Sequence, residues 1–272
     1  MRNDASKSPS HANSALADYY GDGFYDDQIE GSLKSAKKYV DFLKTIFRPD
    51  SVVDVGCGRG AWLKAFKDVG ATKVVGFDGA WNNQQNMIDQ SIEFHGVDLN
   101  ASFASIREEK YDLAITLEVA EHLEPSSAEN FVRSLTHLSD VVMFGAAYTE
   151  QGGSNHINEQ PHTYWANIFA SFNYVPYDIF RPVFWGDLEV EYWYQQNTFL
   201  YVKRNSEAVT FFLDAGYQPM KNIGFMNCVH PALYSSKLSK AVIKQRIKRL
   251  ILEAIPSALR PFARKVTRFG DQ

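Results

Sequence analysis

The sequence contains little cysteine and no long apolar run, and both absences narrow the class of protein. Its only cysteines are Cys57 and Cys228, too few for a disulfide framework or a cluster with zinc-ligand spacing. No stretch reaches the roughly eighteen consecutive apolar residues that a membrane-spanning helix needs. Residues 1–10 are polar and lack the apolar core of a secretory signal. We therefore expect a cytoplasmic protein with reduced thiols.

The net charge of −4 is unevenly distributed. Residues 237–272 hold ten Lys or Arg and two acids, a net charge of +8, so the rest of the chain carries −12. Apolar residues from Ile243 onward recur at helical spacing until Pro256. A basic amphipathic helix favours contact with an anionic membrane surface, and we expect the protein at the inner face of the membrane through this tail. A dimer-forming helix, giving a homodimer, and nucleic-acid contact stay open as alternatives.

The most informative stretch is residues 51–60, which read SVVDVGCGRG. Three valines form an apolar run suited to a buried parallel strand, the glycines end it, and apolar residues at helical spacing follow. The next apolar run ends at Asp78, 22 residues after Gly56, which is about where a Rossmann-like unit places its ribose-binding carboxylate. The spacing G-x-G-x-G lacks the third glycine of the dinucleotide fingerprint, which points away from NAD.

Four motifs in order resemble class I S-adenosylmethionine-dependent methyltransferases: the glycine loop, Asp78, the pair Asp98-Leu99, and the strand that ends at Glu118. The resemblance covers roughly residues 30–150. It implies an α/β fold, Rossmann-like, with a seven-stranded sheet, helices on both faces, and S-adenosylmethionine as cofactor. The cofactor contacts that it implies are Asp54, Gly56, Gly58, Gly60, Asp78, Gly79, Asp98, Leu99 and Glu118.

The rest of the chain is arranged around this domain. We expect a disordered lead and lid over residues 1–30, the methyltransferase domain over 31–205, an extension over 206–236 and the helical tail over 237–272. Within the domain we expect a helix from near Ser32 through Leu43 to a stop at Arg48-Pro49, and a short helix over 101–109. The last two strands are expected over residues 172–180 and 197–203, the second as an antiparallel edge.

The fourth strand delivers a charged cluster to the carboxyl edge of the sheet. Glu118, Glu121 and His122 lie three and four residues apart, so a turn of helix would bring them together. The motif Glu-x-x-Glu-His resembles one in quinone-biosynthesis methyltransferases, where it implies a divalent metal. Because Mg²⁺ prefers more oxygen ligands, we favour Glu118 facing the cofactor and His122 packing or acting as a second catalytic candidate. A divalent metal held by Glu118, Glu121 and His122 stays open as the alternative.

Residues 148–165 follow the fifth strand and are rich in hydrogen-bonding groups, which is typical of a functional loop. His156 is the first candidate for the general base, because an imidazole titrates near neutral pH and can take a hydroxyl proton. A structural or substrate-positioning role for His156 stays open. His162 follows Pro161 and is expected to face the helix or solvent.

Aromatic and amide side chains in the second half of the chain are the types that bind carbohydrate. The candidate acceptor-binding residues are Asn158, Glu159, Tyr164, Trp165, Trp193 and Gln196. The sequence runs His-x-Asn-Glu-Gln (156–160), Tyr-Trp (164–165) and Trp-Tyr-Gln-Gln-Asn (193–197) are similar to runs in bacterial methyltransferases associated with surface-polysaccharide (O-antigen) synthesis. We therefore expect O-methylation of a sugar hydroxyl on a cell-surface polysaccharide or its lipid-linked precursor.

Two alternative functions remain. One is a small-molecule, quinone-type O-methyltransferase, and the other is a non-catalytic binding module that keeps the cofactor fold. Methylation of nucleic-acid bases is disfavoured, because the fourth strand ends in Leu-Glu-Val and lacks the Pro-Pro-aromatic signature of amino-methylating enzymes.

Overall fold

The computed structural model describes residues 22–101 and 109–254. The short helix expected over 101–109, the break at Pro256 and most of the lead over 1–30 fall outside the described residues. The chain divides into two units, one ending at Cys228 and one beginning at Val229, and each is considered by itself.

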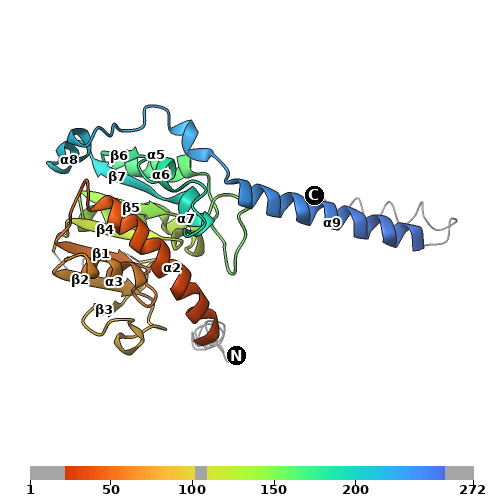
Figure 1. Ribbon diagram of the computed structural model, residues 1–272, viewed down its shortest axis with the longest axis horizontal. Coiled ribbons are helices and arrows are strands. Elements are labelled where there is room, and N and C mark those ends of the chain that lie inside the picture. Colours follow the sequence, from red (N-terminus) through yellow and green to blue (C-terminus); the bar gives the residue numbers. More distant parts are fainter. Residues whose placement is uncertain (1–21, 102–108, 255–272) are drawn as a thin grey trace, which may run out of the picture. The chain divides into compact units, whose positions relative to one another are not determined.

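The first unit is built on a seven-stranded sheet with the order β3-β2-β1-β4-β5-β7-β6. Strands β1, β2, β3, β4 and β5 pair in parallel, while β7 runs antiparallel to both of its neighbours. The expected seven-stranded, Rossmann-like sheet is confirmed (Figure 1). The strands are β1 (Ser51–Val55), β2 (Lys73–Asp78), β3 (Glu93–Gly96), β4 (Leu113–Leu117), β5 (Val141–Gly145), β6 (Tyr174–Tyr177) and β7 (Phe199–Lys203).

The position expected for the last strand is wrong. Strand β7 is antiparallel, as expected, but it lies between β5 and β6, so β6 is the outer strand. Strand β6 contains Pro176, which has no backbone N–H to donate and is therefore suited to an edge. The order of the two strands in the sequence does not reveal this exchange of places.

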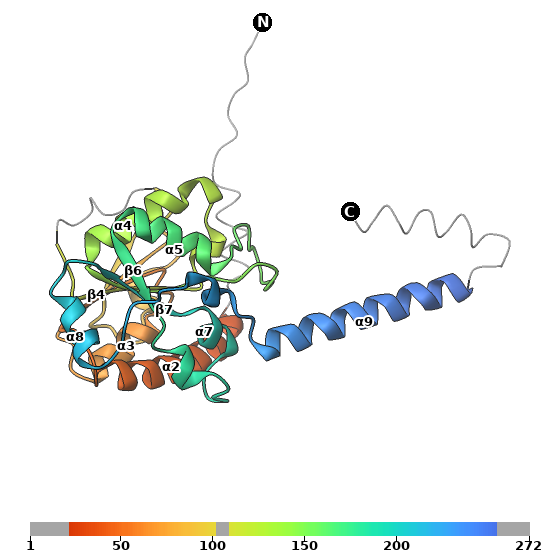
Figure 2. The same cartoon turned by 90° about the horizontal axis from the view of Figure 1, so that it is seen from above.

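Helices cover both faces of the sheet, because successive strand residues point to opposite sides. Val53 belongs to the apolar cluster that contains side chains of α4 (Ala128–Leu138) and α5 (His162–Ser171). Val52 belongs to the other cluster, with side chains of α2 (Asp22–Leu43) and α3 (Ala61–Asp68). Figure 2 shows α4 and α5 on one side of the sheet and α2 and α3 on the other.

Helix α2 begins at Asp22, earlier than the start expected near Ser32, and ends at Leu43, before the stop expected at Arg48-Pro49. Its buried residues Ala36, Tyr39 and Leu43 keep the expected helical spacing. The shorter elements of this unit are η1 (Gln84–Asn86), η3 (Ala120–His122), η4 (Pro125–Ser127), α6 (Arg181–Phe184), α7 (Tyr192–Asn197), α8 (Ala208–Asp214) and η5 (Ile223–Asn227).

The second unit contains α9 (Pro231–Ala254), so the expected tail helix is present and begins earlier than residue 237. Several of its apolar side chains are exposed: Leu238, Val242, Ile243, Ile247 and Leu250. Within the described parts of the chain, no helix combines the length and apolarity needed to cross a membrane. Contact of α9 with a membrane surface stays a prediction.

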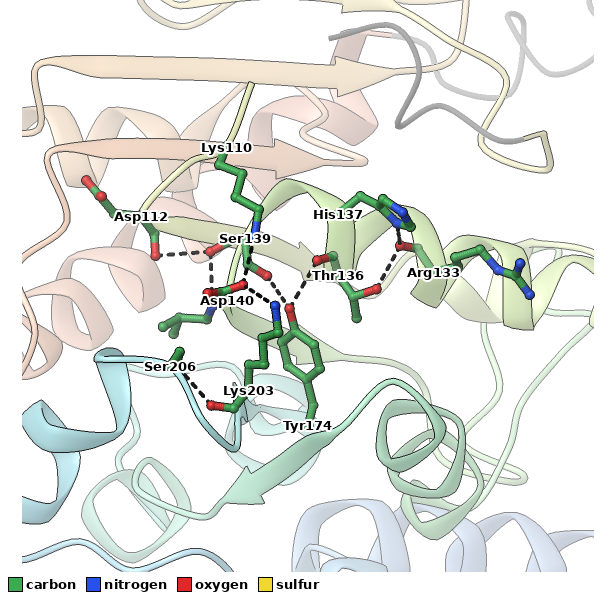
Figure 3. Close-up of polar contacts among 11 residues, drawn as sticks. Lys110, Asp112, Arg133, Thr136, His137, Ser139, Asp140, Tyr174, Lys203 and Ser206 are labelled. Carbon is green, nitrogen blue, oxygen red and sulfur yellow. Dashed lines mark hydrogen bonds and ion pairs between the residues drawn. The ribbon is translucent and has the colours of Figure 1, made fainter. Parts of the chain in front are cut away.

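Polar contacts at the amino end of β5 connect three elements of the sheet (Figure 3). The Tyr174 hydroxyl donates to the backbone oxygens of Ser139 and Thr136, at 2.7 and 3.1 Å. The Asp140 carboxylate pairs with Lys110 at 2.9 Å and with Lys203 at 3.3 Å. These contacts hold the start of β5 against the end of α4 and against β6 and β7.

We expect Tyr174→Phe to lower the free energy of unfolding by about 1–3 kcal/mol, because it leaves buried carbonyl groups without their donor. Tyr201→Phe is the matched control: the Tyr201 hydroxyl is buried and has no hydrogen-bond partner among the described residues, so its removal should not destabilise the protein. Urea unfolding of the two variants measures the difference. Equal losses would contradict the assignment of a stabilising role to the Tyr174 hydroxyl.

Candidate functional site

A pocket of about 820 Å³ lies at the carboxyl ends of β1, β2 and β4. This is the edge of an open α/β sheet where ligands bind. All four motifs identified in the sequence contribute to its lining. The predicted residues that line it are Asp54, Gly56, Gly58, Asp78, Asp98, Leu99, Glu118, His122 and Trp193.

The glycine loop has a backbone that other residues could not adopt without strain. Gly56 and Gly58 have φ values of 82° and 52°, in the region that favours glycine. A Cβ on Gly56 would lie 2.3 Å from Cγ2 of Val119. Gly60 does not line the pocket; it has a φ of 83° immediately before α3, so its position supports a role in starting the helix.

The Asp78 carboxylate is fixed by backbone donors on both sides. Its Oδ2 accepts a hydrogen bond from the Gly58 N–H at 2.7 Å, and its Oδ1 accepts one from the Gly79 N–H at 2.6 Å. Burial raises the pKa of Asp78, and these bonds act against that rise. Burial raises the pKa of Asp54 well above its usual range, and the charge of Asp78 adds to the effect.

Gly79 does not line the pocket either, although it was predicted as a cofactor contact. It packs under Trp81: a Cβ there would lie 2.1 Å from the Trp81 ring. Trp81 lines the pocket and was missed as a candidate, as was Trp62. Both residues are adjacent to the recognised motifs in the sequence, and this adjacency was the signal available. The neighbouring Asn82 donates to the Gly58 carbonyl at 2.5 Å, which ties this segment to the glycine loop.

Glu118 directly follows β4. Its carboxylate is held by two side-chain amides. Oε1 accepts from Nδ2 of Asn197 at 2.8 Å, and Oε2 accepts from Nε2 of Gln151 at 2.9 Å. Neither amide was a sequence candidate, because nothing in the sequence relates α7 or the loop after β5 to the end of β4. Burial raises the pKa of Glu118, and these hydrogen bonds oppose the rise.

A second cluster of ligand-type side chains consists of Glu121, His122 and His156. One ligand atom from each lies within 4.8 Å of the others. It differs from the set considered from the sequence, since His156 takes the place of Glu118. The His122 and His156 rings meet edge to face with centroids 4.7 Å apart. Burial, with a smaller effect from His156, lowers the pKa of His122 to about 4, so its imidazole is neutral at pH 7.

Glu121 is fully buried, and both carboxylate oxygens have no hydrogen-bond partner among the described residues. Burial and the nearby charge of Glu118 raise the pKa of Glu121 well above its usual range. An unpaired buried carboxylate is costly, and a cation is one way to compensate it. Glu121, His122 and His156 therefore fit a divalent cation in donor chemistry.

His156 is oriented by Glu159. The Glu159 Oε1 lies 2.7 Å from His156 Nδ1 and also accepts a hydrogen bond from the Gly152 N–H at 2.6 Å. A carboxylate in this position accepts the Nδ1 proton, which leaves Nε2 with its lone pair. Glu159, predicted as an acceptor-binding residue, therefore contacts His156 in this structure.

Most of the other predicted acceptor-binding residues lie away from the pocket lining. Trp165 is 1% exposed and packs on Phe144 in the core, and Tyr164 packs on Trp165. Asn158 is buried and donates to the Ala120 carbonyl at 3.3 Å. Gln196 is buried and bonds Gln151 and Asn197. Their positions indicate structural roles, since local sequence pattern does not distinguish an aromatic or amide in the core from one in a site.

His162 is buried, so of the two expected positions, facing the helix or facing solvent, solvent is excluded. Its Nδ1 lies 2.7 Å from the Met226 carbonyl and its Nε2 lies 3.0 Å from Oδ1 of Asn197. Burial lowers the pKa of His162 to about 4. It is thus part of the polar network behind Glu118.

The strand order of the sheet, with the pocket at its carboxyl edge, is that of a Rossmann-like methyltransferase fold. A family model described as a methyltransferase domain matches residues 25–146. The chain therefore contains a methyltransferase domain, and the cofactor of this class is S-adenosylmethionine.

Solved structures of other proteins share this fold. The magnesium protoporphyrin IX methyltransferase of Synechocystis PCC 6803, solved with bound S-adenosylmethionine, is 16% identical; the match covers 74% of this chain and 100% of that one, with a TM-score of 0.50. A chain of a Haloferax volcanii complex that contains the Trm112 methyltransferase activator is 15% identical, with coverage of 70% and 97% and a TM-score of 0.52. These likenesses show the fold.

A curated relative is the mitochondrial ubiquinone biosynthesis O-methyltransferase of Dictyostelium discoideum. It is 27% identical over 111 residues. The match covers 36% of this chain and 33% of that protein, so it spans about a third of the relative's length.

We expect the affinity for S-adenosylmethionine to rise with pH. Burial raises the pKa values of Asp54 and Asp78 in the cofactor-free pocket. A bound sulfonium and ammonium favour the ionised carboxylates, so the pKa values fall on binding and protons are released. Binding coupled to proton release strengthens as pH increases through the cofactor-free pKa values.

Calorimetric titrations in two buffers of different ionisation enthalpy measure the released protons. S-adenosylhomocysteine, which lacks the sulfonium charge, should release fewer protons. Proton uptake, or equal release with both ligands, would contradict the expectation.

Proposed function

We propose that this chain is an S-adenosylmethionine-dependent O-methyltransferase that acts on a hydroxyl of a small acceptor. The observation that carries the proposal is the oriented pair Glu159–His156 in contact with His122, a residue that lines the cofactor-type pocket. His156 does not itself line this pocket, so we infer that the methyl acceptor binds next to His122, within reach of His156.

The pocket suits a cationic ligand with a ribose. Asp54, Asp78 and Glu118 supply carboxylates to its lining, and the fixed Asp78 carboxylate can accept hydrogen bonds from two vicinal hydroxyls. The absence of a side chain on Gly56 and Gly58 leaves room for a close approach to the backbone. We infer that Asp98 and Leu99, which also line the pocket, lie beside the adenine.

S-adenosylmethionine supplies a methyl group on a positively charged sulfur, and loss of this group to oxygen yields neutral S-adenosylhomocysteine. Nε2 of His156 accepts the hydroxyl proton as the oxygen–carbon bond forms. The Glu159 carboxylate, at 2.7 Å from Nδ1, stabilises the imidazolium that results. His122 stays neutral and packs its ring against His156, which helps to hold the base in place.

The small-molecule acceptor is preferred to a sugar for two reasons. Of the six acceptor-binding residues predicted on the carbohydrate interpretation, only Trp193 lines the pocket. The name of the Dictyostelium relative describes O-methylation in ubiquinone biosynthesis. A glycan acceptor therefore keeps only the support of the sequence resemblance, and mass spectrometry of small metabolites and glycans from cells with and without the gene separates the two.

A second candidate is a metal-dependent form of the same reaction, favoured by the unpaired Glu121 carboxylate. Glu121, His122 and His156 would hold the ion. When bound, a divalent cation would lower the pKa of an acceptor hydroxyl. His156 would then be a metal ligand through Nε2. The hydrogen bond from Nδ1 to Glu159 would keep the Nε2 lone pair free for the ion.

We expect His156→Ala to lower kcat by about 10²-fold or more, because general-base catalysis contributes that much, while the Kd for S-adenosylmethionine stays unchanged. Glu159→Gln should give a smaller fall in kcat, because it removes the charge that stabilises the imidazolium. His137→Ala is the control, since His137 is exposed on α4, where its Nδ1 lies 2.7 Å from the Arg133 carbonyl. A kcat for His156→Ala equal to that of His137→Ala would refute the role of the base.

For the metal-dependent form, we expect calorimetry to detect binding of Mn²⁺ or Mg²⁺ to the wild type, and Glu121→Gln to weaken it at least about tenfold, because a carboxylate ligand is lost. Addition of EDTA should then lower kcat. Absence of metal binding together with activity in EDTA would leave the metal-free reaction as the mechanism.

A further inference from the structure

Glu118 has a backbone conformation that needs support. Its φ of 57° lies in the left-handed region, which costs energy for a residue with a side chain. Its backbone N–H donates to the Gly145 carbonyl at 2.9 Å, which joins the end of β4 to the end of β5. The side chain is half-buried and lines the pocket. Such a residue is kept in a strained conformation only when its surroundings determine it.

Two side-chain amides fix the position of the Glu118 carboxylate. Asn197 at the end of α7 and Gln151 in the loop after β5 each donate to one oxygen of Glu118, at 2.8 and 2.9 Å. They also bond each other, since Nδ2 of Asn197 donates to Oε1 of Gln151 at 2.9 Å. The three side chains form a closed triangle of hydrogen bonds.

A second set of contacts fixes the orientation of the amides. Nε2 of Gln196 donates to Oδ1 of Asn197 at 3.0 Å, and the ring of His162 approaches the same oxygen at 3.0 Å. The Tyr148 N–H donates to Oε1 of Gln151 at 3.2 Å. With its oxygen engaged on one side, each amide directs its NH₂ group to Glu118. Satisfied buried networks of this kind are rigid.

We propose that Asn197 and Gln151 are positioning residues that hold the Glu118 carboxylate as a fixed negative charge in the cofactor pocket. We call this pair the amide clamp. The proposal rests on the proposed function in one respect, the binding of S-adenosylmethionine in this pocket. The clamp engages both oxygens of Glu118, which distinguishes it from Glu121, whose oxygens have no partner among the described residues. The two acids thus have separate tasks: Glu118 faces the cofactor, and Glu121 belongs to the cluster with the histidines.

The chemical reason for a clamp made of amides is that they direct a carboxylate without cancelling its charge. A Lys or Arg in their place would form an ion pair and weaken the attraction for a cationic cofactor. Asn and Gln donate hydrogen bonds while remaining neutral. The clamp therefore keeps the charge of Glu118 available to the sulfonium or ammonium of the ligand.

The test is a double-mutant cycle on cofactor affinity, which needs no knowledge of the acceptor. Asn197→Leu removes the amide at similar size. We expect it to weaken S-adenosylmethionine binding about tenfold or more by calorimetry, because a hydrogen bond to a charged group is lost. In the Glu118→Ala background the same substitution should change the Kd less than about twofold, because the clamp then has no carboxylate to hold. Thr198→Val is the control, since Thr198 is equally buried and adjacent to Asn197, but its hydroxyl forms no hydrogen bond with either residue of the clamp.

Titrations are made at a temperature where every variant is folded, as judged by circular dichroism. If Asn197→Leu does not fold, Gln151→Met tests the same proposal from a different element and should show the same dependence on Glu118. Equal weakening in both backgrounds would overturn the proposal, because Asn197 would then act on folding or on the cofactor without Glu118. An unchanged Kd in the wild-type background would also overturn it.

The outcome is independent of the acceptor. A wild-type protein that binds S-adenosylmethionine and methylates no hydroxyl would defeat the proposed function, while the cycle would still decide the role of the clamp.

Discussion

The hydrogen bonds that join the ends of β1 and β2 are the constraint on which the site depends. The N–H groups of Gly56 and Cys57 both donate to the Phe77 carbonyl, at 2.7 and 3.1 Å, and Gly58 then reaches the Asp78 carboxylate. The loop can make these bonds only because glycine accepts positive φ. Once the two strand ends are locked, the start of α3 is set by Gly60, and the carboxylates of Asp54 and Asp78 face the same space.

The two glutamates of this site, half-buried Glu118 and fully buried Glu121, differ in their hydrogen bonding. Each oxygen of the Glu118 carboxylate accepts a hydrogen bond from a neutral amide, whereas the Glu121 carboxylate lies beside His122 and His156 with no hydrogen-bond partner among the described residues. A satisfied buried group costs little, while an unsatisfied one costs about 1–3 kcal/mol or more. Proteins retain a destabilising buried group of this kind mainly where function requires it. This contrast indicates that the Glu121 carboxylate binds a ligand or carries a proton.

The sequence predicted the parts of this structure that are encoded locally. A strand, a glycine turn and an acid at a set spacing give the cofactor edge, because parallel strands place their carboxyl ends together. The parts that failed depend on distant pairing. Nothing near Asn197 indicates that α7 meets the end of β4, and nothing near Trp165 indicates that its ring packs on Phe144 instead of facing a ligand. Likewise, the antiparallel direction of β7 follows from the family resemblance. Its position between β5 and β6 depends on pairing with both strands, which the local sequence does not show.

The edges of the sheet have a consequence for self-association. The outer strand β6 has four residues, one of them Pro176, and the opposite outer strand β3 also has four residues. Short edges, and a proline that cannot donate, are poor templates for adding a strand from another molecule. Both edges of the described sheet thus disfavour strand addition between copies of this protein, and we expect any dimer to form through side chains of helices or loops.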